Sequence, residues 1–307
     1  MKPEIIYEDE YMLAAIKPYG VPAQADHSNR EDMLSILKND LYDRSGKDEE
    51  PYLAVINRLD RPVSGIMLFA KSEEAAAKLS DLLQDRKIEK SYQAVVRGEV
   101  PEDEGILTDW LLFDKKENVS RVVPEGTKGA KKAELSYEVL DILDTDEGTF
   151  TYLLVHLMTG RHHQIRCQLA HAGYPIRGDV KYGPEAGKNA GKTDGSQGAG
   201  KTGGPQSAGK SGGPKSSGKP GGSGDAGKSG KPWAAGKPGG SKDAGKSGSP
   251  WAAGKGRRKN GGRKTPEIGL YSTRIVFTHP YTGEEVFLHR EPEGSSFELL
   301  DAEDPDW

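Results

Sequence analysis

The feature that most constrains how this chain can fold is a long stretch of low complexity, from Glu185 to Lys264. It consists mainly of Gly, Lys, Ser, Pro and Ala, with almost no aliphatic side chains. Such a composition buries too little apolar surface to offset the entropy lost when the backbone is ordered. We therefore expect residues 185–264 to form a disordered, basic, Gly/Lys/Ser-rich insertion.

The two flanking parts, residues 1–184 and 265–307, must then build the folded body together. They hold about 225 residues, which is enough for one hydrophobic core. The later part reads as two strands, Ile268–His279 and Glu285–Arg290, joined by a turn at Pro280–Gly283. Because a two-stranded unit is marginally stable alone, we expect these strands to complete a sheet begun before residue 184. A long insertion in a surface loop adds little loop-closure entropy, so such a discontinuous domain is permitted.

Elsewhere in the chain, strand patterns outnumber helix patterns. Runs rich in β-branched, aromatic and long aliphatic residues predict strands over Glu4–Glu8, Met12–Lys17, Leu53–Ile56, Ile66–Ala70, Ile88–Arg97, Ala133–Leu143 and Thr149–Leu157. Helices are expected over Glu31–Leu41, Glu73–Asp85 and Arg161–Ala172. Strands and helices do not alternate regularly as βαβ units. This order favours an α+β fold with a mixed, mainly antiparallel central sheet flanked by helices.

Charge is divided unevenly along the chain. Residues 185–264 contain 17 Lys and Arg against 4 Asp and Glu, so of the chain's 43 basic and 47 acidic residues, 26 and 43 belong to the body. A cationic insertion on an acidic body has two interpretations that the sequence leaves open. It supplies non-specific attraction to the phosphates of a nucleic acid, or it only keeps a linker soluble.

The segment from Asn57 to Gly65 carries the clearest chemical signal. It places Asp60 between Arg58 and Arg61, with a predicted buried strand on either side. A neighbouring guanidinium favours the ionised carboxylate, while apolar walls limit its hydration. This combination suits a carboxylate nucleophile.

Two later segments make the interpretation specific. They are Lys90–Gly98, which reads KSYQAVVRG, and Leu157–Arg166, which reads LMTGRHHQIR and is followed by GDVKYG from Gly178. In this order along the chain, the three segments resemble the RluA-type family of RNA pseudouridine synthases. The chain departs from the family pattern at Asn57, where most relatives have His, and at His162, where most have Thr. It departs again at Leu270–Ser272, where the usual motif is Leu-His-Ala.

The resemblance implies a role for each motif residue. Asp60 corresponds to the essential catalytic aspartate, and Arg166 to the arginine that pairs with it. Tyr92 corresponds to a tyrosine that packs against the target base and is implicated in removing its proton. Arg58 corresponds to an arginine that helps to displace the target nucleotide from its stack. The remaining motif residues are expected among the RNA contacts: Arg61, Arg161, His163 and Gln164.

The chemistry implied by this resemblance needs no cofactor and no metal. Uridine is isomerised by breaking its bond to ribose, rotating the uracil and rejoining it through carbon, so every atom is retained. A carboxylate can attack either the sugar or the ring, and the residues leave this choice open. The spacing of His163, Cys167 and His171 mimics a set of metal ligands, but a fourth ligand is not evident and a polar helix face is the better interpretation.

The expected partner is RNA, either ribosomal or transfer RNA, and the resemblance suggests a monomer. No signal peptide and no apolar run long enough to span a bilayer are found, and a single cysteine excludes an internal disulfide. These features predict a cytoplasmic protein. The competing interpretation is a non-catalytic RNA-binding or ribosome-assembly factor that keeps the fold and adds a basic arm.

Overall fold

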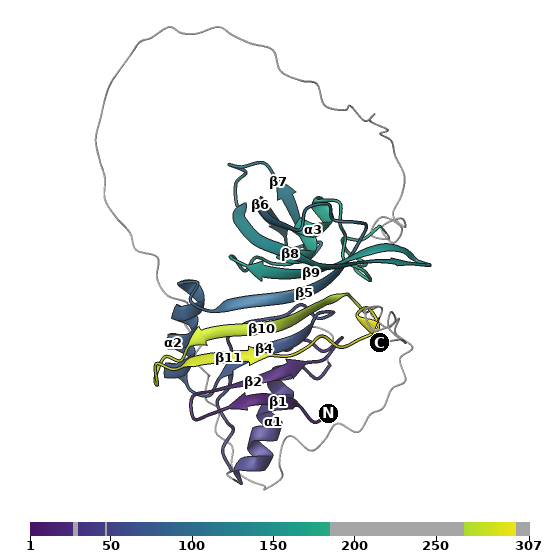
Figure 1. Ribbon diagram of the computed structural model, residues 1–307. Coiled ribbons are helices and arrows are strands. Elements are labelled where there is room, and N and C mark those ends of the chain that lie inside the picture. The colour runs from purple at the N-terminus through teal and green to yellow at the C-terminus, as the bar shows by residue number, and fades with distance from the viewer. Residues whose placement is uncertain (27–29, 47, 185–266, 299–307) are drawn as a thin grey trace, which may run out of the picture. The chain divides into compact units, whose positions relative to one another are not determined.

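The computed structural model describes residues 1–26, 30–46, 48–184 and 267–298. The predicted insertion at residues 185–264 lies outside these ranges, so its disorder and the domain boundaries stay predictions. The described residues form one large sheet and three helices (Figure 1). The expected α+β class is confirmed.

The sheet contains eleven strands among the described residues. Their order across the sheet is β1 (Glu4–Glu8), β2 (Met12–Lys17), β4 (Ser64–Ala70), β10 (Leu270–Thr278), β5 (Glu89–Arg97), β9 (Gly148–Leu157), β8 (Lys131–Thr145), β6 (Glu104–Asp114) and β7 (Val119–Val123). The short strand β3 (Ala54–Val55) pairs with β4, and β11 (Glu285–His289) pairs with β10. All pairings are antiparallel except that of β10 with β4, which confirms a mixed, mainly antiparallel sheet.

The three helices cover the two faces of this sheet. Along β2, Leu13 and Ala15 face one core, in which α1 (Met33–Ser45) and α3 (Gln164–His171) also bury side chains. The alternate β2 residues face a second core that includes the apolar side of α2 (Glu73–Gln84). Alternation of side chains along each strand therefore assigns α1 and α3 to one face and α2 to the other.

The residues after the insertion supply a central strand of the sheet. Strand β10 lies between β4 and β5 (Figure 1), in agreement with the expectation that the late strands complete the sheet. The parallel contact between β10 and β4 is very close at Gly65, which has φ of 114°. A Cβ atom there would lie 2.3 Å from the carbonyl oxygen of Ser272. Only glycine fits this crossing.

Several predicted boundaries were wrong, each for a local reason. Helix α1 begins at Met33 instead of Glu31 because Asp32 is its N-cap and accepts a hydrogen bond from the Ser35 backbone. Helix α3 begins at Gln164 instead of Arg161 because His163 has the left-handed backbone conformation. Strands β6 and β7 were missed. In β6, apolar residues lie on the exposed face as well as the covered one, which hides the alternating pattern.

Candidate active site

Asp60 lies in the loop that joins β3 to β4. The loop closes with a hydrogen bond from the Val63 backbone N–H to the carbonyl oxygen of Asp60, at 3.0 Å. Beneath it, the fully buried Lys17 donates from Nζ to three carbonyl oxygens, those of Pro18, Val21 and Arg61. Burial lowers the pKa of Lys17 to about 7. The buried, hydrogen-bonded Lys17 side chain thus ties the Asp60 loop to the segment that follows β2.

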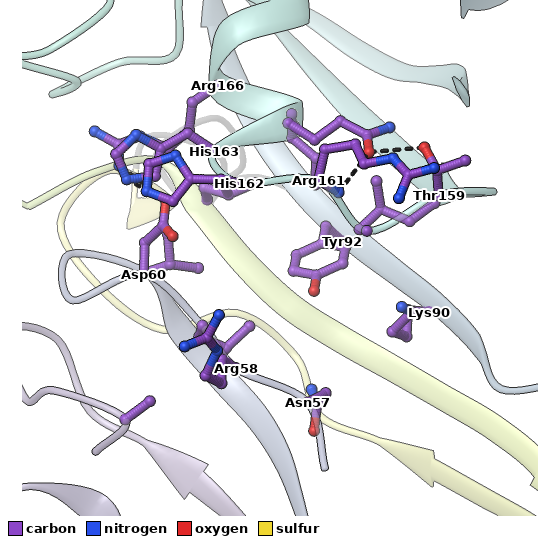
Figure 2. Close-up of a pocket in the computed structure, with 18 of the residues that line it drawn as sticks. Asn57, Arg58, Asp60, Lys90, Tyr92, Thr159, Arg161, His162, His163 and Arg166 are labelled. Atoms are coloured by element: carbon purple, nitrogen blue, oxygen red, sulfur yellow. Dashed lines mark hydrogen bonds and ion pairs between the residues drawn. The ribbon is translucent and has the colours of Figure 1, made fainter. Parts of the chain in front are cut away.

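The ionic partner of Asp60 comes from a distant segment. Arg166, on α3, donates from Nη1 to Oδ2 of Asp60 at 2.9 Å (Figure 2). The arginines nearest in sequence act elsewhere: Arg61 donates to the carbonyl oxygen of Gly20, and Arg58 is exposed at the cleft. Neither adjacent arginine therefore holds Asp60, and its partner is Arg166, the residue that the family resemblance implies.

Arg166 is itself held by a second carboxylate. Its Nε and Nη2 bind the two oxygens of Asp179 at 2.7 and 2.9 Å. The side chain of Asp179 is fully buried, whereas that of Asp60 is 26% exposed. Burial opposes the charge on Arg166, but the hydrogen bonds and charges of Asp179 and Asp60 outweigh it and raise the pKa of Arg166. Burial likewise opposes ionisation of Asp179, yet Arg166 and the backbone of Lys181 and Tyr182 lower its pKa. Arg166 is thus a fixed cation between a buried anchor and an accessible carboxylate.

A neutral histidine lies against the same carboxylate. Nε2 of His163 is 3.4 Å from Oδ2 of Asp60, and Nδ1 is 2.9 Å from the hydroxyl oxygen of Tyr182. The His163 ring stacks on His162 at 3.8 Å between centroids, and His162 packs at 3.9 Å against Phe113. Burial lowers the pKa of His163 to about 3, despite the charge of Asp60, so the ring is neutral at physiological pH.

Tyr92 lies on β5 and lines the same cleft as Asp60 (Figure 2). It is only 6% exposed, and burial raises its pKa to about 12, with the charge of Asp60 acting in the same direction. The phenol is therefore protonated at neutral pH. Nearby, Asn57 accepts from the backbone N–H of Leu68 and donates to the carbonyl oxygen of Ile66. At this departure from the family motif, the amide thus holds the backbone of β4.

The loop before α3 is stabilised by Gln164, which is 3% exposed. Its Oε1 accepts from Thr159 Oγ1 at 2.8 Å and from the Arg161 backbone at 2.9 Å, and its Nε2 donates to the carbonyl oxygen of Glu134. Arg161 donates from Nε to the carbonyl oxygen of Lys132 and lines the cleft. The polar atoms of Gln164 thus all position the loop. The predicted RNA contacts of Arg161 and Gln164 stay predictions.

These elements surround a cleft of about 1740 Å³, larger than the roughly 300–1,000 Å³ of small-molecule pockets. Its lining is basic although the body is acidic. The cations are Arg58, Arg61, Arg86, Lys90, Arg161, Arg166 and Lys181, and the carboxylates are Asp26, Asp60 and Glu89. Burial lowers the pKa of Lys90, and no ion pair to it is found in the part of the chain that the structure describes. Such a cleft suits a polyanion.

Sequence reasoning gave no role to four residues of this site: Lys90, Asp179, Lys181 and Tyr182. All four belong to the motifs quoted for the family resemblance, so the signal was present. What the sequence lacked was their contacts, since Asp179 and Tyr182 act through Arg166 and His163 from a separate turn.

The histidine and cysteine spacing on α3 was weighed as a set of metal ligands. Within the described ranges, no group of three or more His, Cys, Asp or Glu side chains is arranged to hold a metal ion. Cys167 donates from Sγ to the carbonyl oxygen of Ser120, and burial raises its pKa to about 11, whereas His171 is exposed. No helix in the same ranges is long and apolar enough to cross a bilayer.

Comparison with known proteins agrees with this geometry. The family described as RNA pseudouridylate synthase matches residues 11–171, which include Asp60, Tyr92 and Arg166. A protein named tRNA pseudouridine synthase C, from Vibrio parahaemolyticus, is 33% identical over 187 residues, which cover 59% of this chain and 73% of that protein. An uncharacterized RNA pseudouridine synthase of Bacillus subtilis, YlyB, is 32% identical over 185 residues, 59% of this chain and 58% of that protein.

Solved structures support the fold. Human RNA pseudouridylate synthase domain containing 4 superposes with a TM-score of 0.60 at 18% identity, covering 99% of this chain and 95% of that one. Human RNA pseudouridylate synthase domain containing 1 gives 0.56 at 16% identity, covering 95% and 84%. The chain belongs to the RluA-type family of RNA pseudouridine synthases, isomerases that convert uridine in RNA to pseudouridine.

Proposed function

We propose that this enzyme isomerises specific uridines in structured RNA with Asp60 as the nucleophile. The observation that carries the proposal is the carboxylate of Asp60, 26% exposed in a basic cleft and ion-paired to a buried arginine at 2.9 Å. The pairing orients the carboxylate without removing it from the cleft. Tyr92 supplies an aromatic surface beside it, on which a uracil ring can stack.

The target nucleotide leaves its stack to reach Asp60, since the reacting atoms of a uridine inside a helix are inaccessible. The exposed side chain of Arg58, on the same loop as Asp60, takes the vacated space. Arg61 and Arg161 contact the RNA backbone from the cleft walls. His163 and Gln164 were predicted among the RNA contacts, but because both side chains are buried we propose that they hold the geometry of the site instead.

Transfer RNA is the first substrate class to test. Several relatives are named tRNA pseudouridine synthase C, including those of Vibrio parahaemolyticus and Yersinia pestis. The domain arrangement we propose has residues 1–184 and 265–307 forming the catalytic body, with residues 185–264 as a basic insertion that adds salt-sensitive affinity for RNA.

The decisive experiment maps pseudouridine across cellular RNA in a strain lacking this gene, complemented with wild type or with Asp60→Asn. We expect a site that disappears, returns with wild type and stays absent with Asp60→Asn. If Asp60→Asn restores the site, Asp60 is not the nucleophile. If no site changes and the purified protein also modifies no RNA, the non-catalytic RNA-binding role replaces this proposal.

A further inference from the structure

The imidazole of His163 lies between two groups that constrain its protons. Nδ1 faces the hydroxyl of Tyr182 at 2.9 Å, and Nε2 faces Oδ2 of Asp60 at 3.4 Å. The ring is neutral, so one nitrogen carries hydrogen and the other carries a lone pair. The position of that single proton determines whether Nε2 presents an N–H or a lone pair to Asp60.

The Tyr182 hydroxyl determines whether Nδ1 of His163 carries the hydrogen. Its oxygen already accepts the backbone N–H of Ser120 at 2.7 Å. In the described part of the chain, the Tyr182 hydroxyl can donate its proton to Nδ1 of His163. If Nδ1 carried the hydrogen instead, the partly buried hydroxyl would receive two donors and its own proton would lose its protein partner, which is less favourable.

Asp60 determines whether Nε2 of His163 carries the hydrogen. A lone pair on Nε2 would lie 3.4 Å from a carboxylate oxygen, and two groups rich in electrons at this separation repel each other. An N–H there is attracted instead. Both ends therefore select the same tautomer, with the lone pair on Nδ1 and the hydrogen on Nε2.

We propose that His163 is a positioning residue for Asp60: Tyr182 sets its Nε2–H tautomer, and the positive end of that N–H, 3.4 Å from Oδ2, attracts the oxygen that Arg166 binds, leaving Oδ1 as the attacking oxygen. This inference rests on the proposed role of Asp60. Arg166 also binds Oδ2, and no donor to Oδ1 is found in the part of the chain that the structure describes. Oδ1 supplies the electron pair for the new bond. If the bond is to the ribose carbon, the ribose–nitrogen bond breaks and its pair goes to the uracil nitrogen. If the bond is to a ring carbon, the pair of the ring double bond moves onto the uracil. His163 and Arg166 neither gain nor lose a proton in this step.

The first test measures the tautomer directly in the free, full-length protein. In ¹⁵N-labelled protein, the two ring nitrogens of His163 are assigned by their loss in His163→Gln. We expect the hydrogen on Nε2 and a bare Nδ1 in wild type, with a mixture of tautomers in Tyr182→Phe. A hydrogen on Nδ1 in wild type, or a charged ring at neutral pH, overturns the inference. This readout needs no catalysis.

The second test compares two amides at position 163. The Gln side chain places an N–H near the Nε2 position, whereas the shorter Asn reaches only the Nδ1 position. Single-turnover rates should fall less than about threefold in His163→Gln and at least about tenfold in His163→Asn, with KM unchanged. A purely conformational role predicts the reverse order, because His163 has φ of 52° and Asn tolerates this left-handed region better.

His171→Gln is the matched control, since His171 ends the same helix but is exposed and does not line the cleft. Equal rates for His163→Gln and His163→Asn, or faster turnover with Asn, would refute the positioning role. Asp60→Asn separates the two proposals. If it is inactive while the position 163 variants are equal, only the inference about His163 fails. If it is fully active, the proposed nucleophile fails regardless of the tautomer.

Discussion

Replacing Arg166 with Lys tests whether one side chain serves two carboxylates in separate ways. The guanidinium makes three hydrogen bonds, two to Asp179 and one to Asp60. Lysine keeps the charge but offers a compact ammonium in place of a planar fork. The lysine variant will therefore lose some of these three hydrogen bonds, and the burial of each carboxylate determines which bonds are lost.

The ammonium should stay with Asp179. The side chain of Asp179 is fully buried, so water cannot solvate its charge if the ammonium leaves it. The side chain of Asp60 is 26% exposed, so water can solvate its charge when its partner leaves. A hydrogen bond to a charged group is worth about 1.5–3 kcal/mol. Losing the contact to Asp60 should lower the single-turnover rate roughly ten- to 150-fold, at 1.4 kcal/mol for each factor of ten. Losing one of the two bonds to Asp179 should lower the free energy of unfolding by about 1.5–3 kcal/mol.

The rate can be followed by tritium release from RNA labelled at carbon 5 of uridine, and the unfolding free energy by urea titration. Arg161→Lys is the control, because Arg161 lines the same cleft without contacting a carboxylate in the described structure. A rate within twofold of wild type would refute the partition between the two carboxylates. So would a large rate loss that is fully recovered by raising the RNA concentration.

Three further predictions address the sheet, the cleft and the buried phenol. Gly65→Ala should lower the free energy of unfolding by about 2–4 kcal/mol through strain and a backbone clash. Gly148→Ala, at a similar φ of 111° but in open space, should lose only the strain part, and equal losses in urea titrations would refute the clash. Lys90→Met should weaken RNA binding and reduce the slope of log affinity against log salt by about 1, whereas Lys87→Met, outside the cleft lining, should not. A pKa raised to about 12 means that Tyr92 contributes stability below pH 10 that is lost as pH rises through 12. Urea midpoints should therefore fall less over this range in Tyr92→Phe, and identical pH profiles would contradict the buried neutral phenol.

The sequence predicted the fold class and most strands because their signals are local. Strands such as β1 and β2 were bounded correctly, since runs of β-branched and aliphatic residues reveal a strand without knowledge of its partners. The onset of α3 was not predicted. It depends on the left-handed backbone at His163, where no glycine marks the position.

The candidate site divides in the same way. Sequence motifs alone identified Asp60, Tyr92 and Arg166 as a set and gave the reaction class, because the residue types and their order along the chain carry that information. Only the tertiary structure decided the contacts. It joined Arg166 to Asp179, joined His163 to Tyr182, and placed a strand from beyond residue 266 in the centre of the sheet. Contacts between residues far apart in sequence depend on how strands pair and faces pack, and no local pattern records that.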